Sequence, residues 1–141
     1  MRKSYVDLQR NISNISKLPY CKIVHRNKYS FGVEISVREG RYVLRLDYEE
    51  QDLPRVYLVS PEIEVDNWEE IHTFNKQYHR DYKKKSPMLC LTHYQTDKWS
   101  TSTPLVGSYI PWAIEWTEFY ELWLLTGKWY GKGIHTREKG E

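Results

Sequence analysis

Apolar side chains near the start of the chain recur every three or four positions. Within residues 3–16 they are Tyr5, Leu8, Ile12 and Ile15. This spacing predicts one face of a short amphipathic helix. Pro19 ends the helix, because proline cannot continue the helical hydrogen-bond pattern.

Three alternating segments follow, residues 21–25, 29–37 and 42–48, and a fourth strand is expected over residues 55–59. Alternation of this kind places every second side chain on one face of a strand. Glu39-Gly40 is a turn signal between the second and third segments, and the other connections are short. The segments therefore predict a four-stranded antiparallel meander, which ends at Pro61 because proline has no N–H for the ladder.

Residues 62–87 show no period and are mostly polar, so we expect a long irregular loop, of the kind that often carries function. A helical pattern follows from Thr103-Pro104 onward and ends at Gly127, a natural C-cap. Pro111 lies inside this pattern, and we expect either a kink there or two abutting helices. Residues 136–141 are expected to fray.

The order helix, meander, loop, helix predicts an α+β fold, with helices on one face of an antiparallel sheet. At 141 residues the chain has the size of one domain, residues 1–141. Its aromatic content of 15% is too high for a disordered chain. No internal repeat is present.

The charge pattern excludes several classes of protein. A formal net charge of +2 argues against a dedicated nucleic-acid binder, and the short run at 83–85 reads as a solvated loop. The apolar stretch 105–125 contains three glutamates, which argues against a membrane span. No signal peptide is recognisable and the chain has two cysteines, so we expect a cytoplasmic protein with reduced thiols.

Cys90 is the candidate nucleophile. It follows the long loop directly and precedes the aromatic-rich helical stretch, with histidines at 72, 79 and 93 around it. Cysteine in an apolar context is often a buried small hydrophobe, so both interpretations stay open. Cys21, on an expected strand, is interpreted as structural. The histidine spacing does not make a metal site and no glycine-rich phosphate loop is present, so no cofactor is predicted.

The second half of the chain resembles the ubiquitin-conjugating enzymes (UBC-like fold), and more closely their stand-alone relatives in bacterial anti-phage operons, the cyclic-oligonucleotide-based signalling systems (CBASS). In this chain, as in the ubiquitin-conjugating enzymes, the order along the sequence is helix, meander, proline, extended loop, cysteine, tryptophan and helix. The motifs that carry the resemblance are Leu89-Cys90-Leu91, Trp99-Ser100, Ile110-Pro111-Trp112, Glu115-Trp116, Phe119-Tyr120-Glu121, Trp123-Leu124, Thr126-Gly127-Lys128-Trp129 and Gly131-Lys132-Gly133-Ile134-His135.

The resemblance implies that Cys90 carries an acyl group as a thioester. The implied task is to join the C-terminus of a cGAS-like nucleotidyltransferase to an amine, which primes the synthase during infection. That synthase is the expected partner, together with an activating enzyme that loads the cysteine. Neither nucleic acid nor a membrane is expected as a partner.

The His-Pro-Asn motif of ubiquitin-conjugating enzymes is missing. Counted forward from Pro61, His72 fills the histidine position and is favoured; counted back from Cys90, His79 fits better. Asp81 cannot replace the asparagine as a donor, because an ionised carboxylate only accepts hydrogen bonds. Backbone amides or a histidine would have to stabilise the oxyanion.

Two other functions remain open. One is a non-catalytic binding module on the same fold, which holds the nucleotidyltransferase or an effector and keeps Cys90 buried. The other is a cysteine hydrolase that pairs Cys90 with His72, His79 or His135; it requires thiol and base within hydrogen-bond reach.

Overall fold

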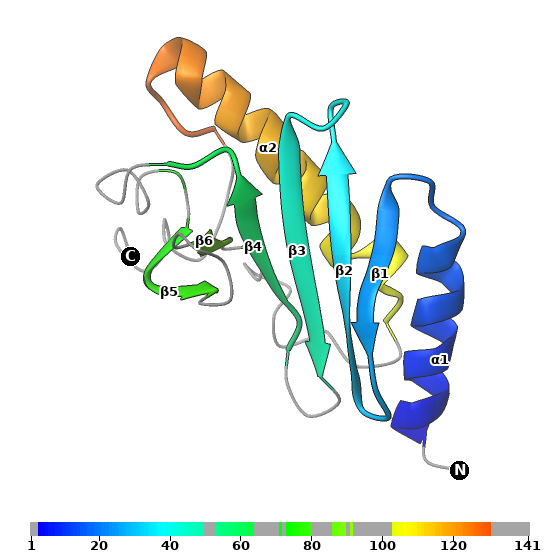
Figure 1. Ribbon diagram of the computed structural model, residues 1–141. Helices are drawn as coiled ribbons and strands as arrows, with labels where there is room; N and C mark the ends of the chain where they lie inside the picture. Colours follow the sequence, from blue (N-terminus) through cyan, green and yellow to red (C-terminus); the bar gives the residue numbers. More distant parts are fainter. Residues whose placement is uncertain are drawn as a thin grey trace.

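A computed structural model describes residues 3–49, 53–63, 71, 73–79, 86–89, 91 and 103–130. For residues 3–5 and 74–79 only the backbone is described. The elements in chain order are one helix, four strands, a further pair of strands, a short 3₁₀ turn and a long helix (Figure 1). The α+β class predicted from the sequence is confirmed.

The N-terminal helix α1, Lys3–Ser16, has the predicted bounds. The apolar positions Leu8, Ile12 and Ile15 are all buried, so the three-to-four spacing does mark the face turned to the core. In Figure 1, α1 runs beside β1 at one edge of the sheet. Asn11 joins the helix to the distant C-terminal part, because its Oδ1 accepts a hydrogen bond from the N–H of Leu105 at 2.9 Å.

The predicted meander is confirmed. Its strands are β1 Cys21–Arg26, β2 Ser30–Val37, β3 Tyr42–Glu49 and β4 Arg55–Ser60, each antiparallel to the next. The alternating positions all turn to one side, where they are buried: Phe31, Val33, Ile35, Val37, Tyr42, Leu44, Leu46 and Tyr48. Period-two alternation is reliable here because only one face of the sheet is covered by helices.

The expectation that residues 62–87 are irregular is wrong for part of that range. Two more strands lie there and extend the sheet: β5 Thr73–His79 and β6 Ser86–Leu89, with the overall order β1-β2-β3-β4-β6-β5. Burial of the polar residues Thr73 and Ser86, both with no exposed surface, hides the strands from a hydrophobicity pattern. Residues 64–70, 72 and 80–85 lie outside the described part.

The C-terminal helical pattern becomes a 3₁₀ turn, η3 Leu105–Gly107, and one long helix, α2 Tyr109–Thr126. Pro111 falls in the first turn of α2, where backbone N–H groups have no helical acceptor, and one helix runs through it from Tyr109 to Thr126; the alternative of two helices that meet at Pro111 is therefore wrong. Gly127 is the predicted C-cap: its φ is 75°, and its N–H donates to the carbonyl of Trp123 at 2.7 Å.

Helix α2 passes behind the sheet and closes the core (Figure 1). Ala113 and Trp116 from α2 belong to the same buried cluster as the strand residues and α1. The motif residues Ala113 and Trp116 therefore serve the core. No helix among the described residues is long and apolar enough to cross a membrane.

Candidate active site at the β5–β6 pair

The β5–β6 pair forms the frame around the two favoured site residues. Thr73 of β5 lies opposite Leu89 of β6 in the antiparallel register. His72 directly precedes Thr73 in the chain, and Cys90 directly follows Leu89; both lie outside the described residues. The structure thus describes their chain neighbours Thr73 and Leu89, but not His72 and Cys90 themselves.

The residues that flank Cys90 and His72 are buried. Leu89 and Leu91, on the two sides of Cys90, expose 3% and 5% of their surface. Ile71 and Thr73, on the two sides of His72, are completely buried. Ile71, Leu89 and Leu91 belong to the core cluster shared with α2. In the chain, each of the two candidate residues therefore stands between neighbours that are buried in the core.

His79 occupies the other end of the strand pair. It is the last residue of β5 and lies opposite Ser86, at the start of β6. Its backbone is described and its side chain is not. The register thus associates His79 with the end of the pair away from Leu89, and separates it from His72. His135, the third histidine considered, lies outside the described residues, as does Asp81.

Trp116 is a site-related residue whose second role the sequence analysis missed. Its ring is part of the core, and its indole N–H also donates a buried hydrogen bond to the carbonyl of Ile71 at 2.9 Å. Sequence patterns could not find this contact, because the acceptor is a backbone oxygen 45 positions away. The bond connects α2 to the backbone just ahead of β5.

The C-terminal half of α2 is held to the turn between β2 and β3. Arg41 Nη2 and Glu121 Oε2 form an ion pair at 2.8 Å, and the Tyr42 hydroxyl donates to the same oxygen at 3.1 Å. Burial raises the pKa of Tyr42, and the hydrogen bond to Glu121 raises it further. The Tyr42 hydroxyl therefore stays protonated at physiological pH and can donate to Glu121. This hydrogen bond and the ion pair with Arg41 both attach α2 to the sheet.

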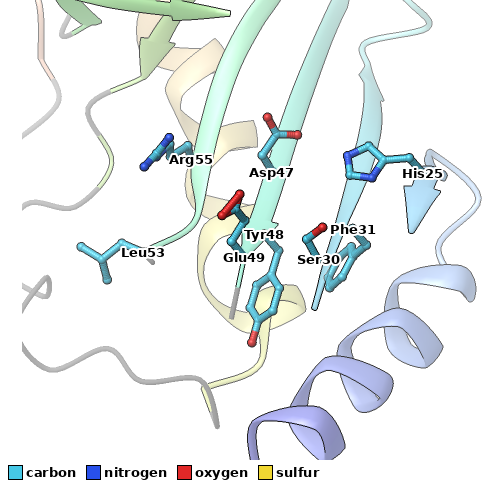
Figure 2. A pocket seen from close by; sticks show the side chains of 8 residues that line it. All are labelled: His25, Ser30, Phe31, Asp47, Tyr48, Glu49, Leu53 and Arg55. Carbon is cyan, nitrogen blue, oxygen red and sulfur yellow. The ribbon is translucent and has the colours of Figure 1, made fainter. Parts of the chain in front are cut away.

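A separate hollow lies at the ends of the meander strands (Figure 2). It has about 440 Å³ of space, part of it open to solvent, and its lining residues are His25, Ser30, Phe31, Asp47, Tyr48, Glu49, Leu53 and Arg55. In Figure 2, His25 and Arg55 lie on opposite sides of Asp47. Arg45 Nε contacts the Asp47 carboxylate at 2.8 Å. None of the described residues that line this hollow is a cysteine.

Cys21 has the properties expected of a structural thiol. It is half-buried at the start of β1 and packs against the core. Burial raises its pKa from 9.0 to about 11. The thiolate is the nucleophilic form of cysteine, so this residue is a poor nucleophile near neutral pH.

We predict slow alkylation of Cys21 at neutral pH. Since its pKa is raised, the thiolate fraction at pH 7.5 is on the order of 0.1% or less, and the rate should rise about tenfold per pH unit until it levels off near pH 11. Mass spectrometry of peptides after iodoacetamide treatment in a Cys90→Ser background measures this rate. A rate that levels off below pH 9 would contradict the assignment.

Within the described ranges no group of three or more histidine, cysteine, aspartate or glutamate side chains is arranged to hold a metal ion. The described part is thus an α+β domain in which a long helix backs an antiparallel sheet, and a buried strand pair carries a cysteine segment at its end. This arrangement is consistent with an E2-like domain, the class of ubiquitin-conjugating enzymes.

Comparison with known families makes the assignment specific. The family model described as "Type II CBASS E2 protein" matches residues 7–136. Because the match covers nearly the whole sequence, the chain belongs to this family. No curated protein matches the sequence.

Proposed function

We propose that this E2-like protein is a conjugating enzyme that forms a thioester at Cys90. In the proposed reaction the C-terminus of a cGAS-like nucleotidyltransferase is the acyl group, and an amine is the acceptor. A separate activating enzyme would load the cysteine. We further propose that residues 1–141 act as one domain in the cytoplasm. Membership in the CBASS E2 family supports both the reaction class and the partner.

The burial of the two leucines around Cys90 is the observation that carries this proposal. Leu89 and Leu91 are two positions apart and both are buried in the core. Cys90 stands in the chain between these two residues, so the cysteine segment is attached to the packed core on both sides. A nucleophile that must meet a protein substrate benefits from such a rigid attachment, and this supports the proposal.

The register of the strand pair supports His72 as the partner of Cys90. Thr73 and Leu89 are paired, and opposed Cα atoms in an antiparallel ladder lie about 5 Å apart. His72 directly precedes Thr73 in the chain, and Cys90 directly follows Leu89, so the pairing joins the two segments that carry the proposed partners.

The same register argues against His79 as that partner. His79 lies opposite Ser86, at the far end of β6 from Leu89. An extended strand rises about 3.3 Å per residue, which places Leu89 roughly 10 Å along β6 from the level of His79, and Cys90 follows Leu89 in the chain. We propose that His72 supplies the hydrogen bond to the developing oxyanion which the missing asparagine provides elsewhere among ubiquitin-conjugating enzymes.

The reaction can be tested without knowing the activating enzyme. A short peptide ending in a glycine thioester of mercaptoethanesulfonate offers an activated, unhindered carbonyl. The Cys90 thiolate attacks this carbonyl, a new carbon–sulfur bond forms, and mercaptoethanesulfonate leaves as a thiolate. We expect intact-protein mass spectrometry to show one peptide adduct that dithiothreitol removes.

The alternatives predict other results. A binding module with a buried thiol gives no adduct until the protein is unfolded. A cysteine hydrolase consumes the peptide thioester and releases free peptide acid with no accumulated adduct. An adduct that resists dithiothreitol would point to acylation of a lysine and would contradict the thioester.

A further inference from the structure

We propose that the solvent-facing side of the α2 tip is a docking surface for a second copy of this chain. The α2 tip comprises residues 118–128: the last turns of the helix, its C-cap and Lys128. In Figure 1 the end of α2 projects past the ends of the neighbouring strands. This surface is separate from the β5–β6 pair and does not depend on the thioester chemistry proposed for Cys90.

Two exposed leucines form the apolar part of this surface. Leu122 exposes 42% of its surface and Leu125 84%. With 3.6 residues per turn, positions 122 and 125 lie on the side of α2 opposite to its buried positions, which are Ala113, Trp116 and Tyr120. Single exposed leucines are ordinary, but a neighbouring pair at a projecting helix end, bordered by charged residues, is typical of an interaction site.

Charges of opposite sign flank the leucine pair. Glu118 lies one turn before Leu122 on the same side of the helix, and 61% of its side chain is exposed although Arg38 is 3.8 Å away. Lys128 follows the C-cap and is exposed. Its place is fixed from the next residue, because the Trp129 ring packs against the helix, 6.0 Å from the Phe119 ring. Along the helix axis the surface is therefore acidic, then apolar, then basic.

This order of charges is complementary to a second copy in antiparallel orientation. A two-fold axis midway between Leu122 and Leu125 packs each leucine of one copy against the other leucine of its partner. Glu118 comes shortly before that axis and Lys128 shortly after it, so each glutamate lies near the level of the partner's Lys128. A parallel arrangement would oppose like charges instead. The surface thus fits itself in one orientation, and a contact of this kind closes as a dimer.

The contact is small, so the dimer is expected to be weak and reversible, as is usual for protein interfaces below about 1,200 Å². Sedimentation equilibrium of the full chain should show an average mass that rises from 17.1 kDa toward twice this value between about 5 and about 500 µM protein. A mass of 17.1 kDa at every concentration overturns the proposal and leaves the surface to a different protein. Growth beyond the dimer overturns it as well, because a two-fold contact is closed.

Leu125→Glu and Leu124→Glu form a matched pair of variants. Leu124 is also exposed, by 59%, but it points about 100° away from Leu125 around the helix axis. Leu125→Glu places a carboxylate on both sides of the two-fold axis, and we expect it to raise the dimer Kd at least ~100-fold. Leu124→Glu should keep the Kd within about threefold of the parent. Both leucines lie outside the core, so both variants should fold as the parent does. Equal weakening by the two substitutions contradicts the proposed face.

Charge reversal tests the antiparallel orientation. Glu118→Lys and Lys128→Glu each oppose like charges at two symmetric places, and we expect either one to raise the dimer Kd about 3- to 10-fold at low ionic strength. The double variant restores the attraction with the charges exchanged and should dimerise as the parent does. Within one copy the two residues are roughly 15 Å apart along the helix, so recovery reports a contact between copies. A double variant as weak as the single ones refutes the antiparallel dimer.

Discussion

Replacement of Cys90 by alanine is expected to abolish acyl transfer. In the proposed reaction the Cys90 sulfur carries the acyl group, and without it the two-step path through a covalent intermediate does not exist. We expect no adduct with the peptide thioester and a fall in transfer to hydroxylamine of at least ~10⁴-fold relative to the parent. Intact-protein mass spectrometry and a colorimetric hydroxamate assay measure the two quantities.

Cys90→Ser and Cys21→Ser complete this comparison. A serine hydroxyl is a weaker nucleophile, and any adduct it forms is an ester that dithiothreitol leaves intact, whereas the parent adduct is removed. Cys21 is half-buried with its pKa raised to about 11, so Cys21→Ser should load as the parent does. A normal, thiol-sensitive adduct on Cys90→Ala rules out Cys90 as the acyl carrier.

Phage infection provides the corresponding test in cells. With the synthase and the rest of the operon expressed, the conjugating enzyme predicts that Cys90→Ala loses protection, measured as efficiency of plating. A binding module predicts full protection from the same variant. The thermal midpoint of the purified variant should be checked first, because Leu89 and Leu91 are core residues and a defect there would affect folding rather than chemistry.

Replacement of His72 by alanine is expected to slow discharge of the loaded thioester ~100- to 1,000-fold. This is the typical cost of removing one donor to an oxyanion that develops during acyl transfer. Loading itself should change less, since the donor thioester brings its own good leaving group. Discharge is measured by adding hydroxylamine to isolated adduct and following the return of free protein.

His79→Ala is the matched control for this experiment. The register puts His79 opposite Ser86, away from the Leu89 end of β6, and we expect its discharge rate to stay within about threefold of the parent. A large loss for His79→Ala with none for His72→Ala would reverse the assignment of the two histidines. Equal rates for both variants would leave backbone amides as the oxyanion donors.

The sequence predicted the first half of the fold well because each element there has a pattern of its own. In α1, β2 and β3 the buried apolar residues repeat at the helical or the strand period. β5 and β6 escaped prediction for a physical reason. Thr73 and Ser86 are polar yet fully buried, so a hydrophobicity pattern does not mark them. These strands are defined by pairing: β5 pairs with β6, and β6 also pairs with β4.

The candidate site divides along the same line. Cys90 and its two leucines could be singled out from local sequence, and Cys90 stays a prediction. The choice between His72 and His79 could not be made by counting, since two counts disagreed. The proposal of His72 uses the pairing of Thr73 with Leu89, which is a contact between residues 16 positions apart.

By itself the sequence determined which segments are helix or meander strand, which residues can carry thiol chemistry, and which family the chain resembles. These depend on side-chain type and on spacing along the chain. Only the tertiary structure decided that β5–β6 joins the sheet and that the Trp116 indole bonds to the Ile71 carbonyl. A backbone oxygen is the same in every residue, so no sequence pattern can mark which one a distant donor will reach.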